Sequence, residues 1–175
     1  MDQIVVGVAD CRFGHVPGQV LATYALGSCI GLAVHDPATA VGGLLHFMLP
    51  DSTIDPARGR QKPFMFADTG IPLLLEQVCG SGASKRRLQA YAIGGAQMVD
   101  QESVFEIGKR NYLAMRRILW KAGVLLNGEV VGGSSSRTVR LEIGTGRLWI
   151  REAGMQTEMV TSMAEKGRNS WRIVS

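Results

Sequence analysis

Residues 23–50 constrain the fold of this chain more than any other stretch. They contain two apolar runs, residues 30–34, where large aliphatic side chains alternate with small ones, and residues 41–49. An Asp-Pro pair opens the interruption at residues 36–39, and these residue types are favoured at the first two positions of a type I turn. The pattern therefore predicts a buried antiparallel hairpin with a four-residue loop.

Two residues of this hairpin, Cys29 and His46, are unusual in a plain core strand. A four-residue loop permits a register in which they lie directly opposite each other and His35 lies opposite Ala40. Opposed Cβ atoms are about 4.5–5.5 Å apart, so a thiol and an imidazole could then interact. A slip of one residue would send the two side chains to opposite faces of the sheet, so this register is a hypothesis.

A thiol beside an imidazole has an obvious chemical use. Histidine stabilises the thiolate nucleophile and later acts as an acid for the leaving group. The bend formed by Leu26, Gly27, Ser28 and Cys29 would expose backbone N–H groups that bind an oxyanion. Spacing alone leaves a simpler alternative open, in which Cys29 is a small buried hydrophobe and its partner is a core histidine.

Composition limits the class of protein. A chain of 175 residues, 46% hydrophobic and 19% charged, predicts one globular domain with a sizeable core. Its three cysteines form no CxxC pair, which argues against a disulfide framework or structural zinc, and we expect no metal and no cofactor. The net charge of +4 comes without the aromatic residues of a single-strand binder, so we expect a solvated basic face and no nucleic acid.

The termini and the apolar runs carry no membrane signal. No run reaches the roughly 18 apolar residues of a spanning helix, and the start, Met-Asp-Gln, lacks the basic region of a signal peptide. We therefore expect a cytoplasmic protein without direct membrane insertion.

The remaining patterns predict a layered architecture. Helical periodicity occurs at residues 68–79, with Asp68 or Thr69 as the N-cap, and at residues 103–122; strand patterns occur at residues 4–9, 20–24, 88–93, 124–131, 138–143 and 147–151. Loops are expected at residues 11–18 and 50–62. The predicted fold class is α/β (α+β), a layered sandwich of mixed β-sheets with two main helices packed on them. We expect a catalytic domain at residues 1–152 and a C-terminal extension at 153–175, which could be a short helix or an ordered extension.

Short motifs are spread along most of the chain. They are Thr23-x-x-Leu26-Gly27-Ser28-Cys29, Asp36-Pro37, Gly42-Gly43, His46-Phe47-Met48-Leu49-Pro50, Phe66-Ala67-Asp68-Thr69, Gly94-Gly95-Ala96, Ile107-Gly108-Lys109-Arg110-Asn111, Gly132-Gly133 and Thr145-Gly146-Arg147. Together they resemble the chemoreceptor glutamine deamidases, the CheD family, over roughly residues 4–152. The pairing of Gly-Ser-Cys with His-Phe-Met-Leu-Pro at this spacing is the most specific part of the resemblance.

The resemblance implies roles for particular residues. The family's nucleophile falls on Cys29, its base on His46 and its third catalytic residue on Thr23. Such a threonine can orient the imidazole by hydrogen bonding but cannot stabilise a cation as a carboxylate would. We expect the backbone of Gly27 and Ser28 to contribute to the oxyanion site. One departure is Val130, because the family usually has an acidic residue two positions before the second Gly-Gly pair; the acidic Glu129 precedes it.

The implied activity is conversion of chemoreceptor glutamine side chains to glutamate through a cysteine thioester, on a layered α/β fold. The implied partners are the cytoplasmic helical bundle of chemoreceptors and a CheC-type phosphatase. Two alternatives stay open at this point. One is a non-catalytic adaptor that binds receptors or the phosphatase, and the other is a cysteine peptidase or acyltransferase that uses the same pair of residues.

Overall fold

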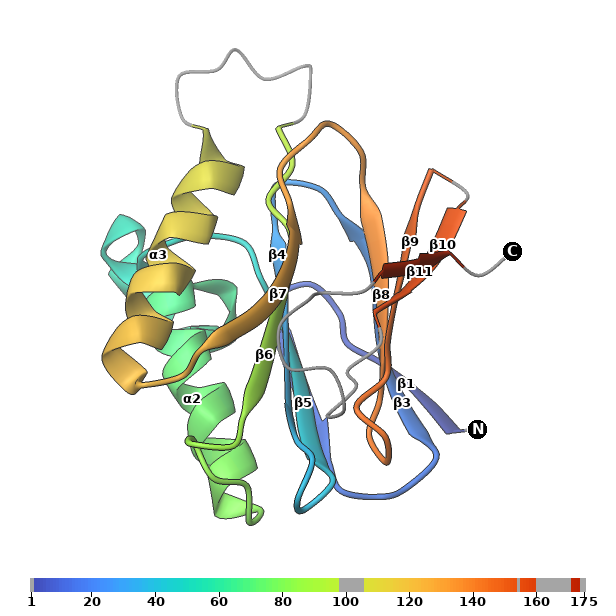
Figure 1. Cartoon of the computed structure of the whole chain (residues 1–175). Coiled ribbons are helices and arrows are strands. Elements are labelled where there is room, and N and C mark those ends of the chain that lie inside the picture. The colour runs from blue at the N-terminus through green and yellow to red at the C-terminus, as the bar shows by residue number, and fades with distance from the viewer. Residues whose placement is uncertain (1, 98–105, 154, 160–170, 174–175) are drawn as a thin grey trace.

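The protein is built of three layers, two stacked β-sheets and a layer of helices (Figure 1). The computed structural model describes residues 2–97, 106–153, 155–159 and 171–173. Helices α2 (Ala67–Gly80) and α3 (Ile107–Ala122) cover the outer face of one sheet, and the second sheet packs on its other face. The predicted α/β sandwich with two main helices is confirmed.

The strands divide between a six-stranded and a five-stranded sheet. The six-stranded sheet has the order β1 (Asp2–Val5), β3 (Gln19–Leu26), β8 (Arg137–Glu142), β9 (Leu148–Glu152), β10 (Met155–Met159) and β11 (Trp171–Ile173). The five-stranded sheet has the order β2 (Asp10–Gly14), β5 (Val41–Phe47), β4 (Ile30–Asp36), β6 (Gln89–Gly94) and β7 (Leu126–Val131). The short segment at residues 27–29, called here the Cys29 bend, therefore carries the chain from one sheet to the other.

The predicted turn between β4 and β5 is present. The N–H of Thr39 donates to the carbonyl of Asp36 at 3.3 Å, as expected for a turn with Asp first and Pro second. Ala40 follows in the left-handed region, with φ of +53°, and pairing resumes with Val41 opposite Asp36. The loop thus spans residues 37–40, and its left-handed last residue was not part of the predicted geometry.

The predicted register of this hairpin is wrong. His46 lies opposite Gly31 instead of Cys29, and His35 lies opposite Gly42. The shift amounts to two residues because the turn closes later than predicted. Side chains alternate with period two along a strand, so a shift of two leaves each of them on its predicted face.

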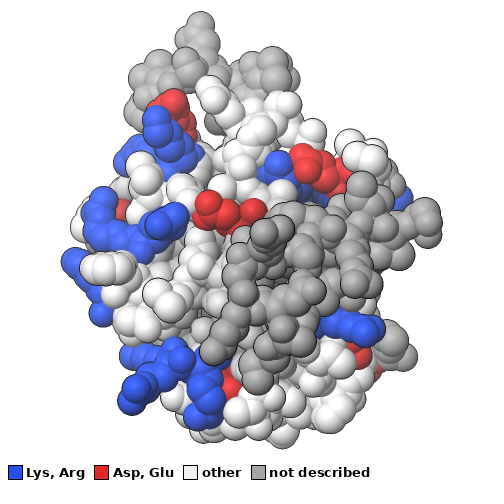
Figure 2. Space-filling model, viewed as in Figure 1, with Lys and Arg blue, Asp and Glu red and all other residues white. Residues whose placement is uncertain are grey.

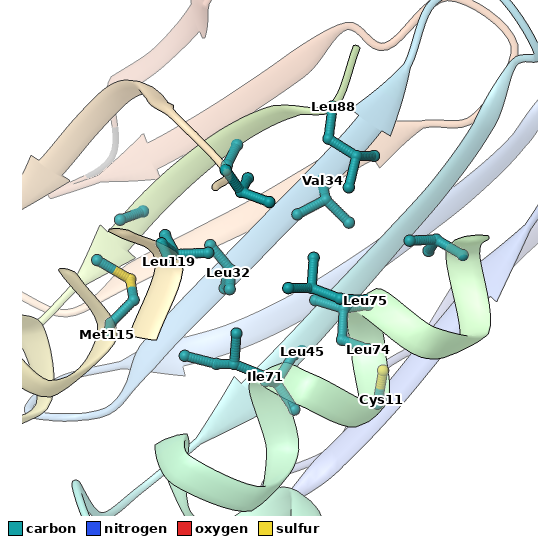
Figure 3. Close-up of a cluster of buried hydrophobic side chains, with 14 of the residues drawn as sticks. Cys11, Leu32, Val34, Leu45, Ile71, Leu74, Leu75, Leu88, Met115 and Leu119 are labelled. Carbon is teal, nitrogen blue, oxygen red and sulfur yellow. The ribbon is translucent and has the colours of Figure 1, made fainter. Parts of the chain in front are cut away.

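Both faces of the β4–β5 hairpin are buried, which explains its nearly continuous apolar sequence. One face packs on the helices, where Leu32 and Leu45 meet Ile71 and Leu74 of α2 and Met115 of α3 (Figure 3). The other face packs on the six-stranded sheet. The candidate site lies in this second layer, between the sheets.

Several local predictions need correction. The expected loop at residues 11–18 contains strand β2, and the expected loop at 50–62 contains a 3₁₀ turn (Ser52–Ile54) and the short helix α1 (Pro56–Gln61). The N-cap of α2 is Phe66, so Asp68 lies within the first turn instead of capping it. Helix α3 begins at Ile107; the expected start at 103 lies outside the described residues. The described parts of residues 153–175 form β10 and β11, and the domain division at residue 152 remains a prediction.

Positive charge gathers over the helices (Figure 2). Exposed basic side chains on α3 are those of Lys109, Arg110, Arg116, Arg117 and Lys121. Two of them are partly balanced, Lys109 by Glu106 at 3.3 Å and Arg116 by Glu129 at 3.9 Å. Among the described residues, no helix has the length and apolar character needed to cross a membrane.

Candidate functional site

Thr23 and His46 are joined by a buried hydrogen bond between the two sheets. Thr23 Oγ1 lies 2.8 Å from His46 Nδ1 and 2.8 Å from the backbone oxygen of Val6. A hydroxyl has one hydrogen and the Val6 carbonyl can only accept, so the hydroxyl donates to Val6 and accepts from Nδ1–H. This assignment leaves Nε2 of the neutral imidazole with its lone pair, and Nε2 has no hydrogen-bond partner in the described structure.

A β-bulge in β3 follows Thr23 directly and returns Leu26 to the buried face on which Thr23 lies. Thr23 pairs with Val139 and Leu26 with Arg137, so β3 has one residue more than β8 between these two pairs. Ala25 takes up the extra residue, with φ of +55°. Residues three apart in a regular strand face opposite sides, whereas here Thr23 and Leu26 are both fully buried.

Cys29 lies on the same side of the five-stranded sheet as His46. Its half-buried side chain packs against the core between the sheets. Gly31 lies between them in the pairing, directly opposite His46, and a Cβ there would be 2.9 Å from Leu26 Cδ1 and 3.5 Å from Thr23 Cγ2. Cys29 and His46 are thus diagonal neighbours across the hairpin, and no hydrogen bond joins Sγ to Nε2 in the described residues.

The Cys29 bend is held by its carbonyl groups. The carbonyl of Gly27 accepts from Ala96 N–H and that of Cys29 from Gly95 N–H, both at 2.8 Å. Among the described residues, the N–H groups of Gly27 and Ser28 donate no hydrogen bond to a protein oxygen, so these two N–H groups have no protein partner within this part of the chain.

Gly94 and Gly95 make this anchoring possible. Both have positive φ, +115° and +61°. A Cβ on Gly94 would collide with the carbonyl oxygen of Cys29. Only glycine fits this contact and this conformation together.

Burial keeps both reactive groups neutral. It raises the pKa of the Cys29 thiol, which its own backbone N–H lowers by a smaller amount. Burial also lowers the pKa of His46 to about 4. At neutral pH the pair is therefore a thiol and a neutral imidazole, and not a preformed ion pair.

Comparison with known proteins identifies the family. A family model described as "CheD chemotactic sensory transduction" matches residues 48–152. A Solibacter usitatus protein named "Probable chemoreceptor glutamine deamidase CheD" is 71% identical, over 97% of this chain and 100% of the relative. A Syntrophus aciditrophicus protein named "Probable chemoreceptor glutamine deamidase CheD 1" is 46% identical, over 88% of this chain and 96% of the relative. The chain belongs to the CheD family.

Val130 and Glu129 lie on opposite faces of the five-stranded sheet. The motifs that carry Thr23, Cys29 and His46 meet between the sheets, as described above. Val130, at the usually acidic position, packs against the same core as Cys29, whereas Glu129 accepts from Tyr112 Oη at 2.7 Å. The carboxylate of Glu129 therefore interacts with helix α3, on the other side of the five-stranded sheet from Cys29 Sγ.

Asn111 contacts the candidate site although the sequence analysis gave it no role. It ends the motif at residues 107–111 and is fully buried. Its Nδ2 donates to the carbonyls of Ser28 at 3.0 Å and Met48 at 2.7 Å. No local signal distinguishes this asparagine from its exposed neighbours, because its partners lie 83 and 63 residues away in the sequence.

The remaining thiols and imidazoles of this CheD chain lie elsewhere. Cys11 is buried beside Gln77, and burial raises its pKa to about 12. His35 is buried near the other end of β4, with Nε2 2.8 Å from the carbonyl of Ile143. In the parts of the chain that the structure describes, His, Cys, Asp and Glu form no group of three that could hold a metal ion.

Proposed function

We propose that this chain is a glutamine deamidase of chemoreceptors in which Cys29 is the nucleophile, His46 the base and Thr23 the residue that orients it. Membership of the CheD family supports the activity, since relatives at up to 71% identity bear that name. The observation that carries the residue assignment is the buried chain from Val6 O through Thr23 Oγ1 to His46 Nδ1. It directs the free lone pair of Nε2 into the layer that also receives Cys29.

The reaction begins when substrate enters beside the Cys29 bend. His46 Nε2 takes the thiol proton, and Sγ attacks the carboxamide carbon of a glutamine side chain. The carbonyl oxygen becomes an oxyanion, and the N–H groups of Gly27, Ser28 and Cys29 stabilise it. The imidazolium returns its proton to the nitrogen, the C–N bond breaks, and ammonia leaves with a thioester on Cys29.

Water completes the cycle. His46 removes a proton from a water molecule, and the resulting hydroxide attacks the thioester carbon. The C–S bond breaks, the thiolate regains its proton, and the substrate side chain leaves as glutamate. No metal or cofactor is needed for either half of this sequence.

The names of the relatives point to chemoreceptors as the substrate. We propose that their cytoplasmic helical bundle is the part modified, and that a CheC-type phosphatase is a second partner. A cytoplasmic location remains a prediction. A non-catalytic adaptor is less well supported, because the relatives are named as deamidases and all three positions to which the resemblance gives a catalytic role are filled.

The test uses a receptor cytoplasmic domain, incubated with the wild type, Cys29→Ala or Cys79→Ala, and peptide mapping by mass spectrometry. We expect conversion of Gln to Glu by the wild type and by Cys79→Ala, whose thiol is also half-buried, and none by Cys29→Ala. Added hydroxylamine should intercept the thioester and give a hydroxamate at the same glutamine. Conversion that survives Cys29→Ala would contradict the nucleophile; binding without conversion would favour the adaptor, and backbone cleavage a peptidase.

A further inference from the structure

Asn111 connects the two chain segments that carry the nucleophile and the base. Ser28 immediately precedes Cys29, and Met48 lies two residues after His46. One amide nitrogen, Asn111 Nδ2, donates to the carbonyls of both. The nucleophile segment and the base segment therefore share a single anchor.

The orientation of the Asn111 amide is fixed by its neighbours. Nδ2 has two hydrogens, and two carbonyl oxygens accept them. The flipped amide would place Oδ1 against both carbonyls, which is repulsive. In the observed orientation Oδ1 is buried and has no partner among the described residues, so these two bonds are made at the cost of an unpaired acceptor.

Helix α3 holds Asn111 firmly against the site. A Cβ on Gly108, one turn earlier, would lie 2.5 Å from the carbonyl oxygen of Gly95 and 2.8 Å from that of Ala96. Gly95 and Ala96 in turn donate their N–H groups to the Cys29 bend. The helix, the glycine turn and the bend thus form one packed unit, and the Asn111 bond to Met48 joins this unit to the end of β5.

We propose that Asn111 is a positioning residue that sets the distance between Cys29 and His46. The inference rests on the proposed function, because it assumes that these two side chains exchange a proton. No direct hydrogen bond holds Sγ and Nε2 together, so their separation depends on the backbone that carries them. Displacements of about 1 Å in such a pair reduce rates roughly 100-fold.

The test compares Asn111→Leu with Asn111→Gln. Leucine keeps the branching at Cγ and removes both donors; glutamine keeps both donors on a side chain one carbon longer. If the leucine variant does not fold, Asn111→Ser, which admits water, takes its place. His35→Leu is the control, because it also removes a buried polar side chain that has one unpaired polar atom; His35 makes one hydrogen bond, where Asn111 makes two, and lies away from the site.

Two readouts separate positioning from general stability. The first is kcat and KM for Gln-to-Glu conversion. The second is the pH dependence of Cys29 alkylation, followed by peptide mapping, with the buried Cys11 as the internal reporter of unfolding.

We expect Asn111→Leu to lower kcat roughly 10–100-fold with KM nearly unchanged. Its alkylation profile should shift toward that of His46→Ala, and Asn111→Gln should recover part of both.

The control decides the interpretation. His35→Leu should lose thermal stability yet keep the wild-type kcat and alkylation profile. A wild-type kcat in Asn111→Leu, or an equal loss of kcat in His35→Leu at equal loss of stability, would overturn the positioning role. Absence of Cys29-dependent conversion in the wild type would instead contradict the proposed function itself.

Discussion

Replacing Thr23 with valine tests the buried hydrogen-bond chain most directly. Valine has the shape of threonine and opens no cavity, but it removes the bonds to Val6 O and to His46 Nδ1, each 2.8 Å long. A carbonyl and an imidazole N–H are then left unpaired in a layer where Thr23 and His46 are almost completely buried. Each unpaired buried group costs about 1–3 kcal/mol, so the variant should be about 2–4 kcal/mol less stable once the ring relaxes.

The effect of Thr23→Val on the reaction should be separable from its effect on stability. Without the hydroxyl, the His46 ring is free to rotate or to move its proton to Nε2, where it can no longer accept from a thiol. Loss of the oriented base should lower kcat roughly 100-fold, which corresponds to about 2.7 kcal/mol in the activation free energy.

The Thr23→Val assay pairs kcat for receptor deamidation with urea unfolding and the ¹⁵N chemical shifts of His46. Thr23→Ser keeps the hydroxyl and is the control, with kcat expected within about threefold of the wild type. A valine variant with a kcat near that of the wild type, or a wild-type protein whose His46 proton is on Nε2, would refute the orienting role of Thr23.

Three further predictions follow from buried contacts. Burial lowers the pKa of His46 to about 4, so kcat/KM should fall on the acid side only near pH 4. The unfolded chain takes up this proton near pH 6.5, so the free energy of unfolding should decrease as pH drops from about 6.5 toward 4. An acid limb of kcat/KM near pH 6.5 would argue against His46 as the base. Gly94→Ala should abolish activity, because the new Cβ displaces the Cys29 bend. Gly132 has a φ of +80° but open space around it, so Gly132→Ala should lower the free energy of unfolding in urea by only about 1–2 kcal/mol. Burial would raise the pKa of Asp36, but bonds with Arg87 and two backbone N–H groups lower it to about 2. Arg87→Ala should therefore lower the stability measured by urea unfolding at pH 7, and the difference from the wild type should shrink as pH falls toward 2.

The layers of the fold could be predicted from the sequence because apolar patterning reports burial directly. The β4–β5 hairpin is apolar at nearly every position, and the structure buries it on both faces. Its register could not be predicted in the same way. It depends on Ala40 adopting the left-handed region, which alanine rarely does and no local signal announces.

Strand β2 was missed for a related reason. Cys11 is buried while Arg12 is exposed, but the run is short and ends at Gly14, so it has the composition of a loop. Its strand conformation comes from pairing with β5, some 30 residues later. Tertiary pairing of this kind outweighs local propensity, and single-sequence patterns cannot report it.

The candidate site shows the same limit more sharply. Spacing indicated Cys29 and His46, but only the resemblance to a family indicated Thr23, and neither gave Asn111 a role, although it stands in one of the family's motifs. The contacts of Thr23 and Asn111 span from 17 to 83 residues. Side chains that act by bridging distant backbone segments leave no local periodicity, and only the assembled fold reveals them.

The neutral resting state of the pair makes the proposed mechanism depend strongly on geometry. With a pKa of about 4, His46 is a weak base, and the buried Cys29 thiol gives up its proton reluctantly. Thr23 orients the ring without adding the negative charge that would stabilise an imidazolium. Proton transfer is therefore unfavourable until the oxyanion forms against the N–H groups of the bend. The imidazolium that results is a strong acid, which favours protonation of the departing nitrogen. The low pKa thus slows the first proton transfer and assists the second, so the enzyme gains most from features that hold sulfur, imidazole and bend in fixed relation.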